Sequence, residues 1–158
     1  MMDLIPKPKL KNGTGIAPMP QARIAKIREL EQKVRELPQV AATTQHIIHG
    51  GMYVRTILVP ANTVLVGALI NVPTILIVQG DVTVAVNDGI LRLTGYNVLP
   101  ASSGRKQAFT AHSDTHLTMV FATEADTVDK AEEQFTDEAD KLMSRQADAI
   151  NHTNITGE

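Results

Sequence analysis

Residues 74–98 read TILIVQGDVTVAVNDGILRLTGYNV, and this segment carries the clearest signal for the class of fold. Apolar and polar residues alternate from Asp81 to Val86, which places Val82, Val84 and Val86 on one face of a β-strand. The Asn-Asp-Gly triplet that follows is typical of a tight hairpin turn, because its residues tolerate a positive φ. The segment therefore predicts antiparallel strands with an apolar face.

Similar β-branched runs lie on both sides of this hairpin. Turn residues separate the runs, and Gln79-Gly80-Asp81 and Gly95-Tyr96-Asn97 are interpreted as two of these turns. No helix of crossover length lies between the runs, so the sequence predicts a mainly β fold, with one antiparallel jelly-roll barrel as the simplest closure. Seven or eight strands are expected, and the runs cover residues 53–59, 64–70, 74–78, 82–86, 90–94, 107–111 and 115–121.

The segments that flank the predicted barrel differ from it in composition. Residues 1–20 contain four prolines and predict an extended arm, whereas strong helix formers predict a helix over 21–38. The barrel itself, residues 41–123, holds only four basic and three acidic side chains. Residues 124–147 predict an acidic helical segment, and residues 148–158 predict a polar tail that is disordered in an isolated chain.

Two features of the flanking segments bear on assembly. Residues 1–40 sum to +4 and residues 124–158 to −7, which fits either head-to-tail pairing between copies or two solvated helices. An apolar stripe on the predicted first helix fits either packing between copies or docking on its own barrel. The candidate residues are Ile27, Leu30, Val34 and Leu37 for the oligomer stripe, and Lys7, Lys9 and Lys11 for an anchoring arm.

Composition excludes several classes of function. The chain of 158 residues has no cysteine, which excludes disulfides, thiolate zinc sites and cysteine nucleophiles. A formal net charge of −2 and an aromatic content of 3% give no basis for specific nucleic-acid binding. No apolar run approaches the roughly 20 residues that cross a bilayer, so no membrane partner is expected.

One short basic segment is the clearest candidate binding site. Arg105, Lys106 and Gln107 follow a Ser-Ser-Gly loop. Cationic side chains beside flexible backbone N–H groups predict an anion-binding site. The alternative is an ion pair between this segment and the acidic residues 124–147 of the same chain or a neighbouring one.

The histidines give no stronger candidate. His46 and His49 are three residues apart, but the Thr pair before them and the Gly pair after them favour a strand or loop over the helix that a metal pair would need. His112, Ser113 and Asp114 have the residue types of a hydrolytic triad, yet neighbours on one turn do not pass a proton inward. No catalytic residue and no metal ligand is therefore predicted.

Two motifs within residues 50–123 resemble those of the cupin superfamily. The first comprises Pro60-Ala61-Asn62-Thr63, Val66-Gly67-Ala68 and the run from Ile75 to Val82, and the second comprises Gly95 to Pro100 with Gly104-Arg105-Lys106-Gln107. The resemblance implies a double-stranded β-helix fold. Metal-binding cupins carry histidines and a carboxylate at the positions that hold Ala68, Ile70, Thr74 or Ile75, and Gln107 in this chain. The resemblance therefore implies the scaffold without its metal centre, and no cofactor is expected.

Residues 93–109 also resemble cupin-like proteins of bacteriophages. This resemblance implies a non-enzymatic virion accessory protein, which decorates the capsid or attaches a fibre or tail. Its partners would be other virion proteins and further copies of itself, as a dimer or trimer, and it would be made in the host cytoplasm and located in the virion. The alternative is a cupin-type small-molecule-binding protein or sugar-modifying enzyme, in which Arg105, Lys106 and Gln107 hold an anionic ligand such as a nucleotide sugar.

Overall fold

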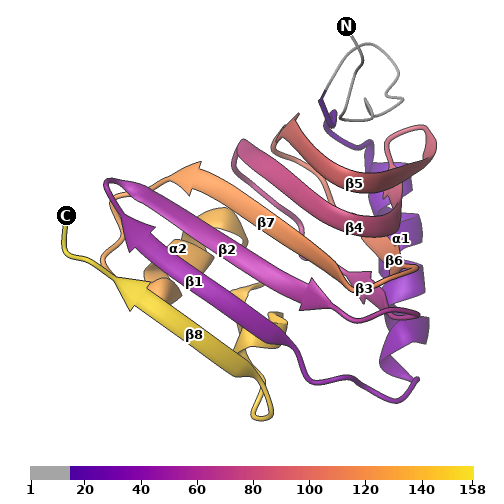
Figure 1. Cartoon of the computed structure of the whole chain (residues 1–158). Coiled ribbons are helices and arrows are strands. Elements are labelled where there is room, and N and C mark those ends of the chain that lie inside the picture. Colours follow the sequence, from indigo (N-terminus) through magenta and orange to yellow (C-terminus); the bar gives the residue numbers. More distant parts are fainter. Residues whose placement is uncertain (1–14) are drawn as a thin grey trace, which may run out of the picture.

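A computed structural model describes residues 15–158, which form one curled β-sheet with helices on one side and at one end (Figure 1). The sheet order is β3-β6-β4-β7-β2-β1-β8, with β5 paired to β4, and every pairing except β1–β8 is antiparallel. The mainly β, antiparallel class is thus confirmed. The strands in residues 15–158 are β1 Thr43–His49, β2 Met52–Val59, β3 Val64–Val66, β4 Thr74–Val86, β5 Gly89–Ala101, β6 Ala108–Ala111, β7 Thr115–Ala122 and β8 Ile150–Ile155.

The β4–β5 hairpin dominates the sheet and turns at Asn-Asp-Gly as expected. The two turns predicted within it are wrong, because β4 runs through Gly80 and β5 runs through Gly95. These two glycines are register partners, and both have a positive φ, of 144° and 73°. Glycine adopts these angles without steric cost. The two strands therefore stay paired on both sides of Gly80 and Gly95.

Strands β1 and β8 complete the far edge of the sheet. The sequence left residues 43–49 open between strand and loop, and they form β1. The expectation of a disordered tail over 148–158 is wrong, because residues 150–155 pair in parallel with β1. The segment reads INHTNI, and every residue in it is exposed. Its sequence lacks the alternation of apolar and polar residues that predicts a half-buried strand.

Three short helical elements and one longer helix accompany the sheet among the described residues: α1 Gln21–Arg35, α2 Val128–Phe135, and the 3₁₀ turns η1 Ala139–Lys141 and η2 Met143–Arg145. Helix α1 ends before Pro38, which disfavours the helical conformation of the residue preceding it. The Oγ1 of Thr127 accepts the backbone N–H of Lys130 at 3.3 Å and caps α2. The acidic segment is not one helix, since the backbone is extended at Thr136. None of these helices has the length and apolar character needed to cross a membrane.

The end of the predicted arm belongs to the folded unit. The backbone N–H of Ile16 donates to Pro100 O at 2.8 Å, and that of Met19 donates to Gly104 O at 2.9 Å. Both side chains are buried. Residues 15–20 therefore pack along the end of β5, whereas Lys7, Lys9 and Lys11 lie outside the described residues.

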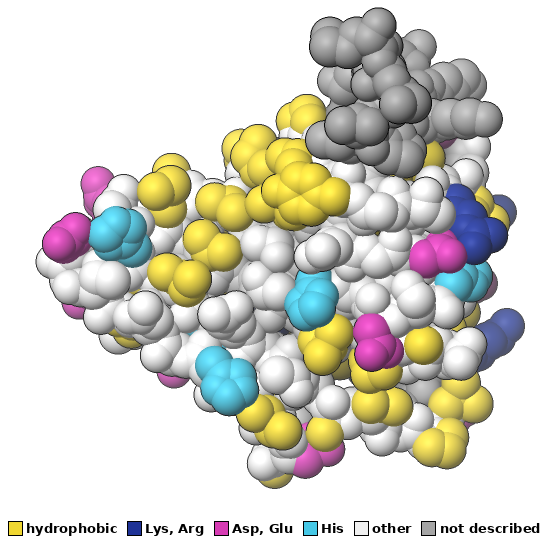
Figure 2. Space-filling view, in the orientation of Figure 1, with side chains coloured by type: hydrophobic (Ala, Val, Ile, Leu, Met, Phe, Trp, Pro, Cys, Tyr) yellow, Lys and Arg dark blue, Asp and Glu magenta, His cyan; other side chains and the backbone are white. Residues whose placement is uncertain are grey.

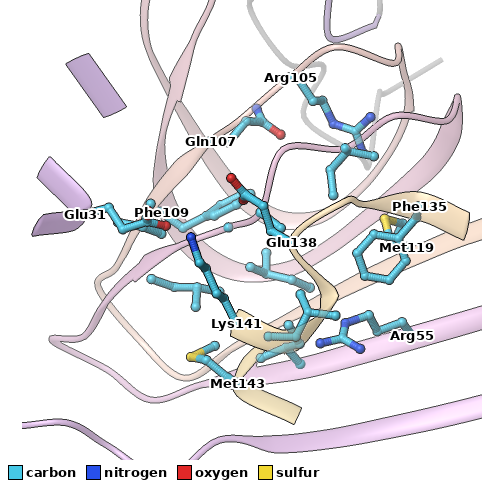
Figure 3. A pocket seen from close by; sticks show the side chains of 18 of the residues that line it. Glu31, Arg55, Arg105, Gln107, Phe109, Met119, Phe135, Glu138, Lys141 and Met143 are labelled. Carbon is cyan, nitrogen blue, oxygen red and sulfur yellow. The ribbon is translucent and has the colours of Figure 1, made fainter. Parts of the chain in front are cut away.

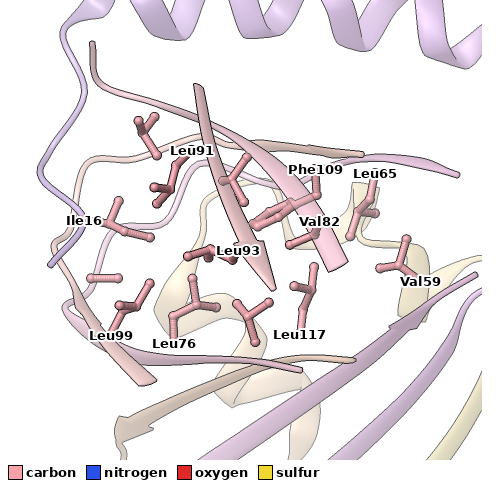
Figure 4. Close-up of a cluster of buried hydrophobic side chains, with 14 of the residues drawn as sticks. Ile16, Val59, Leu65, Leu76, Val82, Leu91, Leu93, Leu99, Phe109 and Leu117 are labelled. Atoms are coloured by element: carbon pink, nitrogen blue, oxygen red, sulfur yellow. The ribbon is translucent and has the colours of Figure 1, made fainter. Parts of the chain in front are cut away.

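The core fills the concave side of the sheet (Figure 4). Val82, Val84 and Val86 all point into it, as their alternation predicted. A second cluster packs α2 against the sheet through Tyr53, Phe121 and Phe135, among other residues. A third cluster docks α1 on the barrel end, and its members are Met19, Ile24, Ile27 and Ala108.

The predicted oligomer stripe is divided by this docking. Ile27 is buried against Ala108, so it is not part of a free face. Leu30 and Leu37 are exposed, and Val34 is half-buried. Docking on the chain's own sheet thus accounts for Ile27, and packing between copies through Leu30, Val34 and Leu37 stays a prediction.

Candidate functional site

A pocket of about 130 Å³ opens between the concave face of the sheet, helix α1 and the segment from α2 to η2 (Figure 3). Its wall is largely apolar and comes from strands that are distant in sequence. The apolar lining residues are Ile57, Leu65, Val66, Ala68, Ile70, Leu76, Phe109, Leu117, Met119, Phe135, Leu142 and Met143. The polar lining residues are Glu31, Arg35, Arg55, Arg105, Gln107, Thr118, Glu138 and Lys141.

Arg105 is a buried cation without a carboxylate partner among the described residues, and its side chain is 2% exposed. Its guanidinium donates to Ser102 O at 2.7 Å and to Thr74 Oγ1 at 2.8 Å, whereas its Nε has no acceptor. Burial disfavours the charged form and lowers the pKa of Arg105 to about 10. The group stays charged at neutral pH, and no ion pair with a described residue offsets the cost of removing this charge from water.

Gln107 adds a second donor without an acceptor. Its backbone is fixed, because its carbonyl accepts the N–H of Gly67 at 2.9 Å. Its side chain lines the pocket (Figure 3), and its Nε2 is buried with no hydrogen-bond partner among the described residues. Native proteins pair nearly all buried donors with protein or water acceptors, so these two pocket donors are left to bind an acceptor from outside the described residues.

Lys106 has a different environment from its two neighbours. Its Nζ is fully buried and donates to Glu31 Oε2 and to Gly67 O, each at 2.8 Å, while Glu138 lies at 3.6 Å. Burial would raise the pKa of Glu138, but the hydrogen bond from Arg28 and the charge of Lys106 outweigh it and leave that pKa below its ordinary value. Lys106 therefore joins Glu31 of α1 to Glu138, the residue before η1, through ion pairs instead of facing a ligand.

A second buried network lies behind the pocket, between β2 and α2. Arg55 and Glu132 are 4% and 1% exposed, and they meet at 2.6 Å. Glu132 also accepts from Ser144 Oγ at 2.5 Å and from Arg145 Nε at 2.9 Å. Burial would raise the pKa of Glu132, but these hydrogen bonds and the Arg55 charge hold it below its ordinary value.

The same network continues to the edge of the sheet through His46. Its Nδ1 lies 2.7 Å from Tyr53 Oη, and its Nε2 lies 2.7 Å from Asn151 Oδ1. Asn151 Nδ2 donates to Ser144 O at 2.9 Å, which leaves its Oδ1 to accept a proton from His46 Nε2. His46 therefore carries its proton on Nε2 and accepts from Tyr53 on Nδ1, as a neutral ring.

We expect this ring to make the stability of the protein dependent on pH. The pKa of His46 lies below its ordinary value of 6.5, chiefly because burial disfavours the charged ring, with the Asn151 bond partly opposing this. The unfolded chain then binds the proton more readily, so stability is full above pH 6.5 and falls as the pH drops from there toward the folded-state pKa. Urea unfolding at pH 7.5 and pH 5.0 measures the loss.

The matched variants are His46→Gln, which keeps a donor and an acceptor, and His116→Gln on the exposed side of β7. The first should lose this part of the pH dependence, and the second should retain it. An equal pH dependence in wild-type protein and His46→Gln would contradict the assignment.

Sequence reasoning found some of these groups and missed others. The sequence singled out Arg105, Lys106 and Gln107 as a binding site. In the structure Arg105 and Gln107 line the pocket, whereas Lys106 forms ion pairs. His46 and His49 lie on opposite faces of β1, because neighbours three apart on a strand alternate. The Arg55–Glu132 network was missed, since its partners are 77 residues apart and nothing local marks them.

The residues around the pocket do not fit a metal centre. Ala68, Ile70 and Gln107 line the pocket, and Thr74 accepts from Arg105 at its edge. Of these four side chains, only the neutral amide of Gln107 could offer a ligand atom to a metal ion in the pocket. The positive charge of Arg105 also disfavours binding of a cation next to it. Within residues 15–158 no three histidine or acidic side chains are grouped as metal ligands.

Comparison with known proteins gives only distant structural similarities. No family model and no curated protein matches the sequence. A cupin-2 domain protein from Shewanella frigidimarina is similar over 59% of this chain and 91% of its own, with 13% identity and a TM-score of 0.42. A cupin superfamily protein from Desulfitobacterium hafniense covers 69% of this chain and 98% of its own, with 9% identity and a TM-score of 0.44.

A third similar structure is a conserved protein of unknown function from Streptococcus pyogenes. It covers 73% of this chain and 99% of its own length, with 9% identity and a TM-score of 0.42. Similarities at this level assign neither a family nor an activity.

Proposed function

We propose that the chain binds a small organic acid in the pocket, with the apolar body of the ligand against the sheet and its carboxylate at Arg105 and Gln107. The observation that carries the proposal is the buried guanidinium of Arg105, which meets no carboxylate of the described residues and whose Nε finds no acceptor among them, together with the buried Nε2 of Gln107, which finds none either. A carboxylate supplies the missing acceptors and the missing negative charge in one group.

The pocket limits the size and character of the ligand. An apolar cavity of about 150 Å³ holds a benzene ring, and the pocket of about 130 Å³ is of that order. Its wall offers aliphatic carbons and the ring of Phe109 to the ligand body. A benzoate-sized acid or a short fatty acid fits these constraints, and the proposed role is binding, with no reaction assigned.

Calorimetry with benzoate and hexanoate, compared with benzamide and hexanol, tests the proposal. We expect the acids to bind and their neutral analogues to bind at least about 10-fold more weakly, because a hydrogen bond to a charged group contributes about 1.5–3 kcal/mol. Arg105→Met should weaken acid binding by about 10- to 100-fold. The variant should remain folded, since it removes a buried charge that has no ionic partner.

Arg92→Met is the matched control, because Arg92 is exposed and pairs with Asp81 away from the pocket. It should leave acid binding unchanged. The proposal fails if no acid of this size binds, or if Arg105→Met binds acids as tightly as the wild-type protein.

The role of a virion accessory protein stays a separate proposal. It rests on the resemblance of residues 93–109 and on anchoring by Lys7, Lys9 and Lys11, which lie outside the described residues. A specific structural observation favours acid binding, and we therefore give that function first place. The two roles are compatible, because the pocket and the N-terminal lysines are separate parts of the chain.

A further inference from the structure

Helix α1 covers the face of the sheet opposite the pocket only at one end, where it packs against Ala85 of β4 and Ala108 of β6, and no other described helix lies on this face. Helix α2 lies behind the sheet in Figure 1, so the viewer looks onto this outer face in Figures 1 and 2. The outward positions follow from strand alternation and from the registers of β8, β1, β2, β7, β4 and β5.

An apolar row crosses this outer face. Ile47, Val54, Val120, Ile75 and Pro100 are successive register partners on β1, β2, β7, β4 and β5. The pair Ile77 and Val98 continues the apolar surface at the next outward level of β4 and β5. Ile75 is 43% exposed and Val98 is 51% exposed, and hydrophobic side chains gather there in Figure 2.

The outer face also lacks free charge. Among the outward side chains of these six strands, only Asp81 and Arg92 are acidic or basic, histidines aside. These two bind one another through a double hydrogen bond of 2.9 and 2.8 Å. A solvated face of an antiparallel sheet usually alternates with polar and charged residues, whereas depletion of charge is typical of interface cores.

From these observations we propose that the outer face pairs with the outer face of a second copy of this chain. The charged side chains of a different partner would have no opposite charges to pair with on this face. When two identical faces meet, neither face brings an unpaired acidic or basic side chain into the interface. Six strands about 4.8 Å apart, each with about six residues of 3.3 Å rise, span roughly 600 Å² per copy. That reaches the lower end of stable interfaces, at about 600–1,000 Å² per partner.

Sedimentation equilibrium of the full chain between 1 and 100 µM tests the pairing. We expect the wild-type protein to form a dimer. The double variant Ile75→Glu and Val98→Glu should raise the dimer dissociation constant by more than about 100-fold, because it places like charges without partners in the interface. Both side chains are exposed in the single copy, so circular dichroism should show an unchanged fold.

The matched control is the double variant Leu37→Glu and Val40→Glu, which changes side chains of 58% and 55% exposure beyond the end of α1. It should keep the wild-type dissociation constant. A companion variant, Ile75→Lys and Val98→Lys, should be monomeric alone and pair with the Glu variant when the two are mixed, as native mass spectrometry would detect. A monomeric wild-type protein at 100 µM, or a dimer that the Glu variant leaves intact, would overturn the proposal.

Discussion

Glu132→Gln is expected to lower the free energy of unfolding by about 3–5 kcal/mol, because it leaves a buried arginine without its counter-charge. Glu132 is 1% exposed and binds Arg55, itself 4% exposed, at 2.6 Å. Glutamine preserves the shape of the side chain but not its charge. Arg55 would keep Tyr53 Oη, Ser144 Oγ and the ring of Phe135 as neighbours, with a neutral amide in place of the carboxylate and thus no negative charge. Urea unfolding followed by circular dichroism measures the change.

Glu133→Gln is a close control for this variant. Glu133 is adjacent in sequence, its side chain is 62% exposed, and it lies 3.7 Å from Arg145. Exposed ion pairs contribute about 0–1 kcal/mol, so the control should change stability by no more than that. Adding Arg55→Met to Glu132→Gln should recover part of the loss by removing the unpaired charge. Equal losses in Glu132→Gln and Glu133→Gln would contradict this account.

The damage from Glu132→Gln should also reach the edge strand β8. Ser144 donates to Glu132 and accepts, through its carbonyl, from Asn151 of β8. Asn151 in turn holds His46 of β1. Amide hydrogen exchange should therefore accelerate over residues 150–155 in the variant, and more than it does in β4 at the centre of the sheet.

Gly80→Ala should be the second most damaging of these changes, with a loss of about 2–4 kcal/mol. A Cβ at this position would lie 2.8 Å from Thr115 Cα and 2.9 Å from Asp114 O, which are backbone atoms that can move only with the start of β7. The φ of Gly80, +144°, also disfavours an L side chain. Thermal or urea unfolding measures the combined cost.

Gly89→Ala separates the two contributions. Gly89 has a similar φ of +154°, but an added Cβ there would have no atom within 4 Å. Its loss should reflect backbone strain alone, at about 1–2 kcal/mol. If both variants lose the same stability, the close approach of β7 to Gly80 is not what requires glycine.

Much of the sheet could be predicted from local pattern. The alternation over Val82, Val84 and Val86 and the Asn-Asp-Gly turn predicted the central hairpin. The interpretation of Gly80 and Gly95 as turn residues was wrong, because glycine permits a bend within a strand as well as a turn between strands. Composition at these positions does not separate the two outcomes.

The candidate site shows the same division. The sequence singled out residues 105–107 as a group because they combine two cations and an amide beside a glycine. Only the fold determines that Lys106 meets Glu31 of α1 and Glu138 just before η1, while Arg105 meets no carboxylate of the described residues. An ion pair between residues 75 positions apart leaves no mark on either local segment.

The amino-acid order by itself determined the antiparallel strand character, the central hairpin and the approximate extent of α1, because each follows from spacing within a few residues. The tertiary structure alone decided that the polar segment of residues 150–155 forms β8, that Arg55 and Glu132 share a buried network, and that Arg105 is left unpaired. The reason is physical. Pairing of backbone and charge across long sequence separations depends on which segments the curled sheet brings together, and local periodicity carries no information about that choice.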